Sequence, residues 1–406
     1  MTYQSVNPYD GKILKTFEGL TDKQLESALE TAETCFESWR HTTFTERATV
    51  VAKAAAIMRA RIDELARPVT LEMGKLIDEA RGEVLLSADI LDYYAKNAEC
   101  FLAPQHLTPS SGEAEVESTP FGVLFGVQPW NFPYYQLARF AAPNLMAGNV
   151  VMVKHAGCVP QCAIAFEKLW LEAGAPAGAY TNLRISYEQV NRVIDDPRIK
   201  GVALTGSVEA GKIVAGRAGL NLKKSTMELG GSDAFIVLED ADLDKTVKWA
   251  IRGKMNNMGQ CCDAAKRFIV VEELADRFLD KFQTALAAFK PGDPMDEATT
   301  LGPLVHGSSP DKTAGSGQTS HRQWRHPGDG WQSDQSTGRV YAADDPDEYP
   351  ARQSRLQGGI LRAGRAVLPG QERGRGSCPR QRFGIWFGGR SLHQGCCTRQ
   401  KCGKPH

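Results

Sequence analysis

Apolar residues recur at helical spacing close to the start of the chain. Thr21 and Gln24 form a capping-box pattern. The apolar positions after it are Leu25, Ala28, Leu29, Ala32, Phe36 and Trp39. They predict a helix with one buried stripe. Two more helices are predicted, one from Thr45 to about Arg61 and one across the Glu72–Ala95 region, with Leu85, Leu86, Ile90 and Leu91 as the apolar positions of the latter.

Short apolar runs then alternate with helical stretches. The Glu113–Val123 region alternates acidic with smaller or apolar residues, which is typical of a strand. Further strands are predicted at Gly122–Val127, Val150–Val153, Val202–Thr205, Ala234–Val237 and Phe268–Val271, with helices between them that include Glu209–Ala218 and Leu243–Asn256. Strands that alternate with helices imply βαβ units, and therefore a parallel sheet covered on both faces. The predicted fold class is α/β.

The pattern ends near His306. Residues 307–406 contain 17 Gly, 13 Arg and 3 Lys but only 8 Val, Leu and Ile together, whereas the first 306 residues contain 14 Arg and 18 Lys. A segment with so little apolar surface cannot offset the entropy lost on ordering. We expect residues 307–406 to be disordered, with a composition like that of coding sequence read out of frame. A divergent but genuine tail is the alternative.

Charge and composition exclude several classes of protein. Lys plus Arg equals Asp plus Glu, 48 each, so no basic excess predicts a nucleic-acid partner. No apolar run reaches the ~18 residues of a membrane helix, and Met1–Lys15 lacks the features of a signal peptide. We therefore expect a cytoplasmic protein with no membrane partner, whose ten cysteines are reduced.

Histidines and cysteines gather near the end of the chain, at His393, Cys396, Cys397, Cys402 and His406. They lack the paired Cys-x-x-Cys spacing of a zinc site, and no apolar framework surrounds them. No metal site is predicted.

Four short stretches carry candidate chemistry. A cysteine pair, Cys261-Cys262, follows Met258-Gly259-Gln260 in a predicted loop, where a thiol can be reactive. The others are Thr226-Met227-Glu228-Leu229-Gly230-Gly231, Gln128-Pro129-Trp130-Asn131-Phe132-Pro133 and Thr205-Gly206-Ser207-Val208-Glu209-Ala210-Gly211. The last joins a strand to a helix whose N-terminal N–H groups can face a pyrophosphate. Taken singly, each also fits a structural role: Cys262 in packing, or Glu228 as a surface or capping carboxylate.

Taken together and in this order, these stretches resemble the aldehyde dehydrogenase superfamily, over about residues 5–304. Among its members, the bacterial NAD(P)-dependent succinate-semialdehyde dehydrogenases are the most similar. Supporting stretches are Leu71-Glu72-Met73-Gly74-Lys75, Gly148–Lys154, Gly292-Asp293-Pro294 and Leu301-Gly302-Pro303-Leu304. The resemblance implies a dinucleotide-binding domain over 1–229, with a β-type oligomerisation segment near 105–120, and an incomplete α/β catalytic domain over 230–306. It also implies a homo-oligomer.

The resemblance assigns the catalytic roles. Cys262 is the expected nucleophile, which adds to the aldehyde carbon and yields a thioester after hydride transfer. Asn131 is expected to donate to the developing oxyanion, together with the backbone N–H of Cys262. Glu228 is expected to be the general base that activates water. Cys261 is interpreted as a spectator.

The resemblance also assigns the cofactor site, for NADP or NAD. The expected contacts are Trp130, Asn131, Lys154, His155, Ala156, Gly157, Gly206, Ser207 and Leu229. Many members have Lys-Pro-Ser-Glu where this chain has Lys154-His155-Ala156-Gly157, and their Glu would repel the 2′-phosphate of NADP. Gly157 removes that obstacle. Taken by itself, Lys154 also fits a solvent-exposed lysine at a strand end, and His155 is interpreted as a loop residue rather than a catalytic one.

The expected substrate is a small aldehyde, and the resemblance favours succinate semialdehyde. Arg139 matches the arginine that would hold the distal carboxylate, although a surface salt bridge is an equally good interpretation. A second arginine of that site is replaced here by Asn256.

After Leu304, the ribose-binding glutamate motif and the later βα units of the family do not follow. Two functional hypotheses therefore stay open: an active dehydrogenase, and a chain that keeps only cofactor-domain features.

Overall fold

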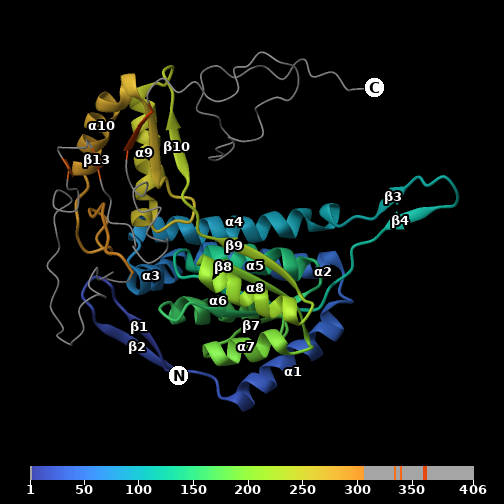
Figure 1. The fold of residues 1–406 in the computed structure, drawn as a ribbon. Helices are drawn as coiled ribbons and strands as arrows, with labels where there is room; N and C mark the ends of the chain where they lie inside the picture. Colours follow the sequence, from blue (N-terminus) through green and yellow to red (C-terminus); the bar gives the residue numbers. More distant parts are fainter. Residues whose placement is uncertain (1, 306–332, 335–338, 341–359, 364–406) are drawn as a thin grey trace. The chain divides into compact units, whose positions relative to one another are not determined.

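The computed structural model describes residues 2–305, 333–334, 339–340 and 360–363. It divides into two compact units, one formed by Met1–Gly230 with the segment from Lys290, the other built around Gly231–Phe289. We call them unit 1 and unit 2 (Figure 1). The sequence had placed residues 290–306 with the second domain. In the structure, residues 290–305 pack on unit 1, because the amide of Ile77 donates to the Pro294 carbonyl at 2.9 Å and Pro303 packs on Gly74.

The helices of unit 1 surround a parallel sheet. They are α1 (Asp22–Trp39), α2 (Phe44–Ala60), α3 (Ile62–Met73), α4 (Ile77–Phe101), α5 (Pro133–Met146), α6 (Pro160–Ala173), α7 (Tyr187–Asp195) and α8 (Val208–Leu220). The sheet contains β5 (Val123–Gln128), β6 (Val150–His155), β7 (Tyr180–Asn182), β8 (Ile199–Gly206) and β9 (Lys224–Leu229). The predicted α/β class is confirmed.

The strand order of this sheet is β7-β6-β5-β8-β9, with every neighbouring pair parallel. The order reverses between β5 and β8, since the chain moves outward from β5 in one direction and then in the other. In open parallel sheets, ligands bind outside the carboxyl ends of the strands at such a reversal. All residues of β6 are buried, as expected for a strand covered on both faces.

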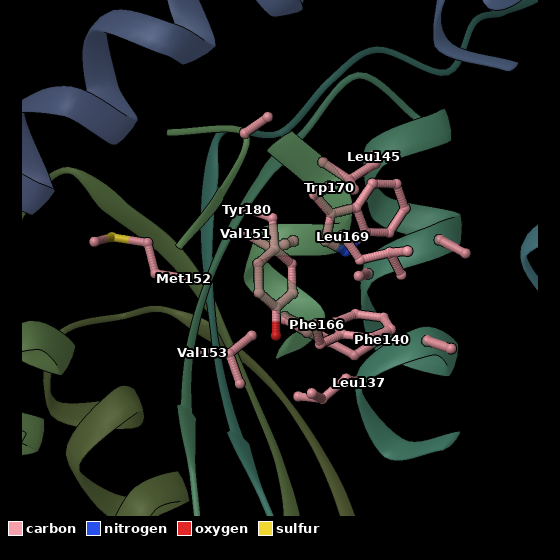
Figure 2. Packing of buried hydrophobic residues seen from close by; sticks show 14 of the residues in the cluster. Leu137, Phe140, Leu145, Val151, Met152, Val153, Phe166, Leu169, Trp170 and Tyr180 are labelled. Atoms are coloured by element: carbon pink, nitrogen blue, oxygen red, sulfur yellow. The ribbon is translucent and has the colours of Figure 1, made fainter. Parts of the chain in front are cut away.

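The core of unit 1 lies between the sheet and its helices. Figure 2 shows Tyr180 beside Phe166 and Trp170 of α6, while Met152 of β6 points to the opposite side of the sheet. The ring centroids of Phe166 and Tyr180 are 5.3 Å apart in an edge-to-face arrangement. Gly126 of β5 faces Phe140 of α5, where an added Cβ would lie 2.6 Å from the ring. A glycine therefore allows α5 to approach the central strand closely.

Two hairpins complete unit 1. They are β1 (Thr2–Val6) with β2 (Ile13–Glu18), and β3 (Gln105–Leu107) with β4 (Ala114–Val116), both antiparallel. The second hairpin projects from the end of α4 with all six strand residues exposed (Figure 1). A hairpin near residues 105–120 agrees with the predicted β-type segment. Its role in assembly stays a prediction.

The helix expected across Glu72–Ala95 is two helices, α3 and α4. Gly74 ends α3 in a left-handed conformation, with φ at +79°. The buried face of α4 also differs from the expectation: Leu85 and Leu86 are 41% and 46% exposed, whereas Glu83 is buried. Glu83 can be buried because a buried lysine pairs with it, a contact that spacing alone does not reveal.

Unit 2 holds a parallel sheet in the order β10-β11-β14. Its elements are β10 (Ala234–Val237), α9 (Leu243–Met255), η1 (Asn256–Gly259), β11 (Arg267–Val271), α10 (Glu272–Ala287) and β14 (Ile360–Ala363). The predicted strand Ala234–Val237 is confirmed at both ends.

Short strands also occur in the tail that was expected to be disordered. Besides β14 they are β12 (Ser333–Asp334) and β13 (Arg339–Val340). The backbone of Ile360–Ala363 pairs with β11, and backbone pairing does not require an apolar sequence period. The expectation for the rest of residues 307–406, including the His and Cys cluster, lies outside the described residues.

Candidate active site

The predicted cofactor residues of unit 1 gather at the carboxyl ends of four adjacent strands. Trp130 and Asn131 follow β5, while Lys154 and His155 end β6. Gly206 and Leu229 are paired residues at the ends of β8 and β9. Gln128 pairs with His155 in register, so the loop after β5 begins beside the end of β6. The sheet thus collects segments that lie as much as 100 residues apart in the sequence.

The loop that carries Asn131 is held by a buried lysine. Lys75 is 1% exposed, and its Nζ donates to the Asn131 carbonyl at 2.9 Å. The same ammonium lies 3.6 Å from the ring centroid of Phe132 and forms an ion pair with Glu83. The second oxygen of Glu83 accepts from the backbone N–H of Tyr134 at 2.8 Å and so caps α5. A charge pair buried this deeply keeps its energy only when its hydrogen bonds are satisfied, as they are here.

His155 holds the ends of the same loop. Its Nδ1 lies 3.2 Å from the Gln128 carbonyl and its Nε2 lies 3.1 Å from the Pro133 carbonyl. Burial lowers the pKa of His155 to about 4, against the opposing effect of the Gln128 carbonyl. The ring is therefore neutral near pH 7 and carries one N–H, which can donate to only one of the two carbonyls at a time. His155 was expected to be a loop residue, but it is the last residue of β6 and is buried, because it pairs in register with Gln128 of β5. Its role as a cofactor contact stays a prediction.

Lys154 is not the solvent-exposed lysine that its strand-end position allowed. It is 6% exposed, and burial lowers the pKa of its ammonium. Its Nζ lies 5.2 Å from the ring centroid of Tyr187 and 6.0 Å from that of Tyr3. Ala156 packs against the core beside it. At Gly157, an added Cβ would meet only the Tyr3 ring, at 3.6 Å, so a side chain could be accommodated there.

Ser207 begins α8. Its hydroxyl accepts from the Ala210 amide at 3.2 Å and forms the N-cap of the helix. Leu229 packs over α8 at Gly211, where a Cβ would lie 2.6 Å from a Leu229 methyl. A Cβ on Gly206 would meet nothing closer than Leu204, at 3.5 Å. The helix N-terminus is therefore fixed, while a Cβ at Gly206 would make only an ordinary contact with Leu204.

Glu228 and Arg139 line one cleft of unit 1. The guanidinium Nη2 of Arg139 lies 3.6 Å from the Glu228 carboxylate, and the two side chains are 33% and 55% exposed. The cleft has a volume of about 300 Å³ and includes Gln128, Asn144 and Lys224 in its lining. A long, solvent-exposed pair of this kind contributes little to stability. The salt-bridge interpretation of Arg139 is thus met, with the expected base as its partner.

In unit 2, the two adjacent cysteines differ in environment. Cys261 is 6% exposed, and its thiol donates to the Asn256 carbonyl at 3.3 Å. Cys262 is exposed. The turn before them contains three left-handed residues, Asn257, Met258 and Gly259, with φ of 51°, 55° and 79°. Two of these residues are not glycine, and the left-handed conformation costs each of them roughly 1–2 kcal/mol. Strain of this kind clusters at functional sites.

Comparison with known proteins identifies the family to which the chain belongs. A profile described as the aldehyde dehydrogenase family matches residues 1–342. The chain belongs to this family. It is 49% identical over 302 residues to a protein from Deinococcus radiodurans named succinate-semialdehyde dehydrogenase [NADP(+)], covering 74% of this chain and 63% of that relative. An aldehyde dehydrogenase from Paenarthrobacter nicotinovorans is 43% identical over 309 residues, covering 75% and 68% of the two chains.

Solved structures of the family show the same fold. The chain matches a crystal structure of succinic semialdehyde dehydrogenase from Streptococcus pyogenes in complex with NADP⁺, with 47% identity and a TM-score of 0.74. The match covers 75% of this chain and 67% of that one. The chain thus spans about two thirds of the length of these relatives, and slightly less for the Deinococcus protein.

Sequence reasoning missed three residues that shape this site. Lys75 was predicted only as a member of the Leu71–Lys75 motif, and no role was predicted for Glu83 or Lys266. Lys75 precedes α4 and Glu83 lies within it, eight residues later. This spacing does not by itself predict a contact, because the direction of the chain at Lys75 depends on the left-handed turn at Gly74. Among the described residues, no cluster of His, Cys, Asp or Glu could hold a metal ion. No described helix is long and apolar enough to cross a membrane.

Proposed function

We propose that this chain oxidises an aldehyde to its carboxylate with NADP⁺, and that the aldehyde is succinate semialdehyde. Family membership and the names of the relatives support the reaction class. The observation that carries the substrate is the cleft in which Arg139 lies 3.6 Å from a carboxylate. The 3.6 Å separation from Glu228 is longer than a hydrogen bond, and the Arg139 side chain is 33% exposed in the cleft, so the guanidinium has donors to offer the distal carboxylate of the substrate.

The reaction needs three groups of the chain. The thiolate of Cys262 adds to the aldehyde carbon, and Asn131 donates to the resulting oxyanion. Once the carbon held by Cys262 has lost its hydride, Cys262 would carry a thioester. Glu228 takes a proton from water, the hydroxide adds to the thioester carbon, and the carbon–sulfur bond breaks to release the carboxylate and the thiolate. The exposure of Cys262, against the burial of Cys261, supports the choice of thiol.

The residues at the carboxyl ends of the strands fit a dinucleotide. When bound, NADP⁺ supplies the hydride acceptor. The N-terminus of α8 at Ser207 would receive the pyrophosphate, because its N–H groups favour an anion and the adjoining Gly206 has no side chain. Lys154 would donate to a ribose, and the room at Gly157 would accept the 2′-phosphate without a repelling carboxylate.

Substitution of Arg139 tests the substrate. Arg139→Leu should lower kcat/KM for succinate semialdehyde by roughly 10- to 150-fold more than kcat/KM for butanal, the effect of one charged hydrogen bond. Any change at Glu228, which also loses its neighbour, falls on both aldehydes alike. Arg192→Leu, which removes an exposed arginine that pairs with Asp22 on another helix, is the control. Equal losses for both aldehydes would reject the substrate assignment.

Substitution of Gly157 tests the cofactor. Gly157→Glu should lower kcat/KM for NADP⁺ more than for NAD⁺ because the carboxylate repels the 2′-phosphate, and Gly157→Gln should separate charge from size. A ratio that does not move would mean that Gly157 is remote from the adenosine ribose. Binding of NADP⁺ without any NADPH formation in the unsubstituted chain would favour the alternative, a chain that keeps only cofactor-domain features.

A further inference from the structure

A lysine four residues after Cys262 bridges two backbone carbonyls of unit 2. The Nζ of Lys266 donates to the Cys262 carbonyl at 3.0 Å and to the Gly231 carbonyl at 2.5 Å. Lys266 is half-buried, whereas Cys262 is exposed. The ammonium therefore connects the turn that carries the thiol to the segment that precedes β10.

The neighbouring residues fix this lysine in place. The amides of Lys266 and Arg267 both donate to the Asp233 carbonyl, at 3.2 and 3.1 Å. The Nε of Arg267 donates to the Ser232 carbonyl at 2.8 Å. Arg267 is also the first residue of β11, which pairs with β10 along its length. The backbone of Lys266 thus leads directly into β11, the middle strand of the sheet, and its own amide is hydrogen-bonded, so its side chain reaches Cys262 from a fixed backbone.

We propose that Lys266 is a positioning residue for the nucleophile. The inference rests on the proposed function in taking Cys262 as that nucleophile. By holding the Cys262 carbonyl, Lys266 fixes the orientation of the residue whose thiol and amide act on the aldehyde. It also places a positive charge against the backbone of the cysteine residue, 3.0 Å from its carbonyl oxygen, and a cation next to a cysteine favours the reactive thiolate. The other charged side chains of this turn and its flanks are Asp263, Arg267 and Lys254.

The experiment measures alkylation of Cys262 by iodoacetamide as a function of pH, with each cysteine followed by mass spectrometry. Cys100, exposed at the end of α4, is the internal control. Lys266→Met should slow alkylation of Cys262 at neutral pH by about threefold to tenfold and move its pH profile to higher pH by about half a unit to one unit. Lys266→Arg should retain most of the reactivity, since it keeps the charge and the donors.

The matched control is Lys248→Met, which removes the same charge from an exposed position on α9 of unit 2. An unchanged Cys262 profile in Lys266→Met would overturn the proposal, and so would an equal shift in Lys248→Met. Faster alkylation of the buried Cys35 and Cys162 in Lys266→Met would indicate a general loss of structure and also count against the proposal, unless Lys266→Arg restores the Cys262 profile.

Alkylation needs no turnover, so the two proposals fail separately. If the chain forms no NADPH but Lys266→Met slows alkylation of Cys262, the proposed function is rejected and the positioning role stands. If the chain is active but Lys266→Met leaves alkylation of Cys262 unchanged, only the positioning role is rejected.

Discussion

The Asn131 loop and the Cys262 turn are built in contrasting ways. The first is held by buried groups: Lys75 at its centre and His155 at its two ends. The second contains left-handed residues and is held by Lys266, which is half-buried. An oxyanion donor works best when it is already in place before charge develops. A nucleophile must instead remain accessible to the substrate. The contrast shows how one chain meets both requirements with lysine–carbonyl contacts at different depths.

The largest expected effect is the loss of activity when the thiol of the Cys262 turn is removed. In a chain with measurable dehydrogenase activity, Cys262→Ala should abolish NADPH formation because no other exposed thiol lies in the turn. Cys261→Ala should retain most of it, since that thiol is buried against the Asn256 carbonyl. Steady-state assays of both variants decide the matter. Equal losses would show that burial does not distinguish the two thiols.

The next effect concerns the loop. Lys75→Met leaves Glu83 buried without its cation, which should lower the free energy of unfolding by roughly 3–5 kcal/mol. Urea unfolding followed by circular dichroism measures this. Lys212→Met, which breaks an exposed pair with Glu209 on α8, should leave the unfolding midpoint unchanged within error. Equal unfolding midpoints for the two variants would show that the buried Lys75–Glu83 pair contributes no more to stability than the exposed Lys212–Glu209 pair.

The smallest effect is a pH dependence. The pKa of His155 is lowered from 6.5 to about 4 in the folded chain, so the unfolded chain takes up the proton first. Stability present above pH 6.5 should therefore fall as the pH drops toward 4, by on the order of 3 kcal/mol. His155→Gln should flatten this part of the curve, whereas His41→Gln, at an exposed position, should not. A curve that keeps its slope in His155→Gln would show that the ring is not buried as a neutral group.

Elements with a strong local signal were predicted well. The capping box at Thr21 and Gln24 is present, and α1 buries Leu25, Leu29, Ala32, Phe36 and Trp39 as expected. The strand β9 was not predicted, because the exposure of most of its residues leaves no apolar run. Its position comes from pairing with β8, a long-range contact.

The candidate site was predicted as a set of motifs and not as a geometry. The order of the motifs named Cys262, Glu228 and Asn131 as catalytic candidates, and their roles stay predictions. The supporting contacts were not predictable, because they join residues whose separation depends on the fold: Lys75 reaches Asn131 across 56 residues. The burial of Glu83 has the same origin, since a carboxylate at an apolar face is stable only beside its cation.

The contacts of Pro294, Glu297 and Pro303 with the start of α4 and the end of α3 make unit 1 discontinuous in the chain. During synthesis, the ribosome must produce all of Gly231–Phe289 before the segment that completes unit 1 emerges. Until then Gly74 has no Pro303 to pack against, and the amide of Ile77 lacks the Pro294 carbonyl. Closing a loop of this length costs little more entropy than closing one half as long. Each unit is therefore completed by a segment that is synthesised after part of the other: unit 1 by the segment from Lys290, and the sheet of unit 2 by β14.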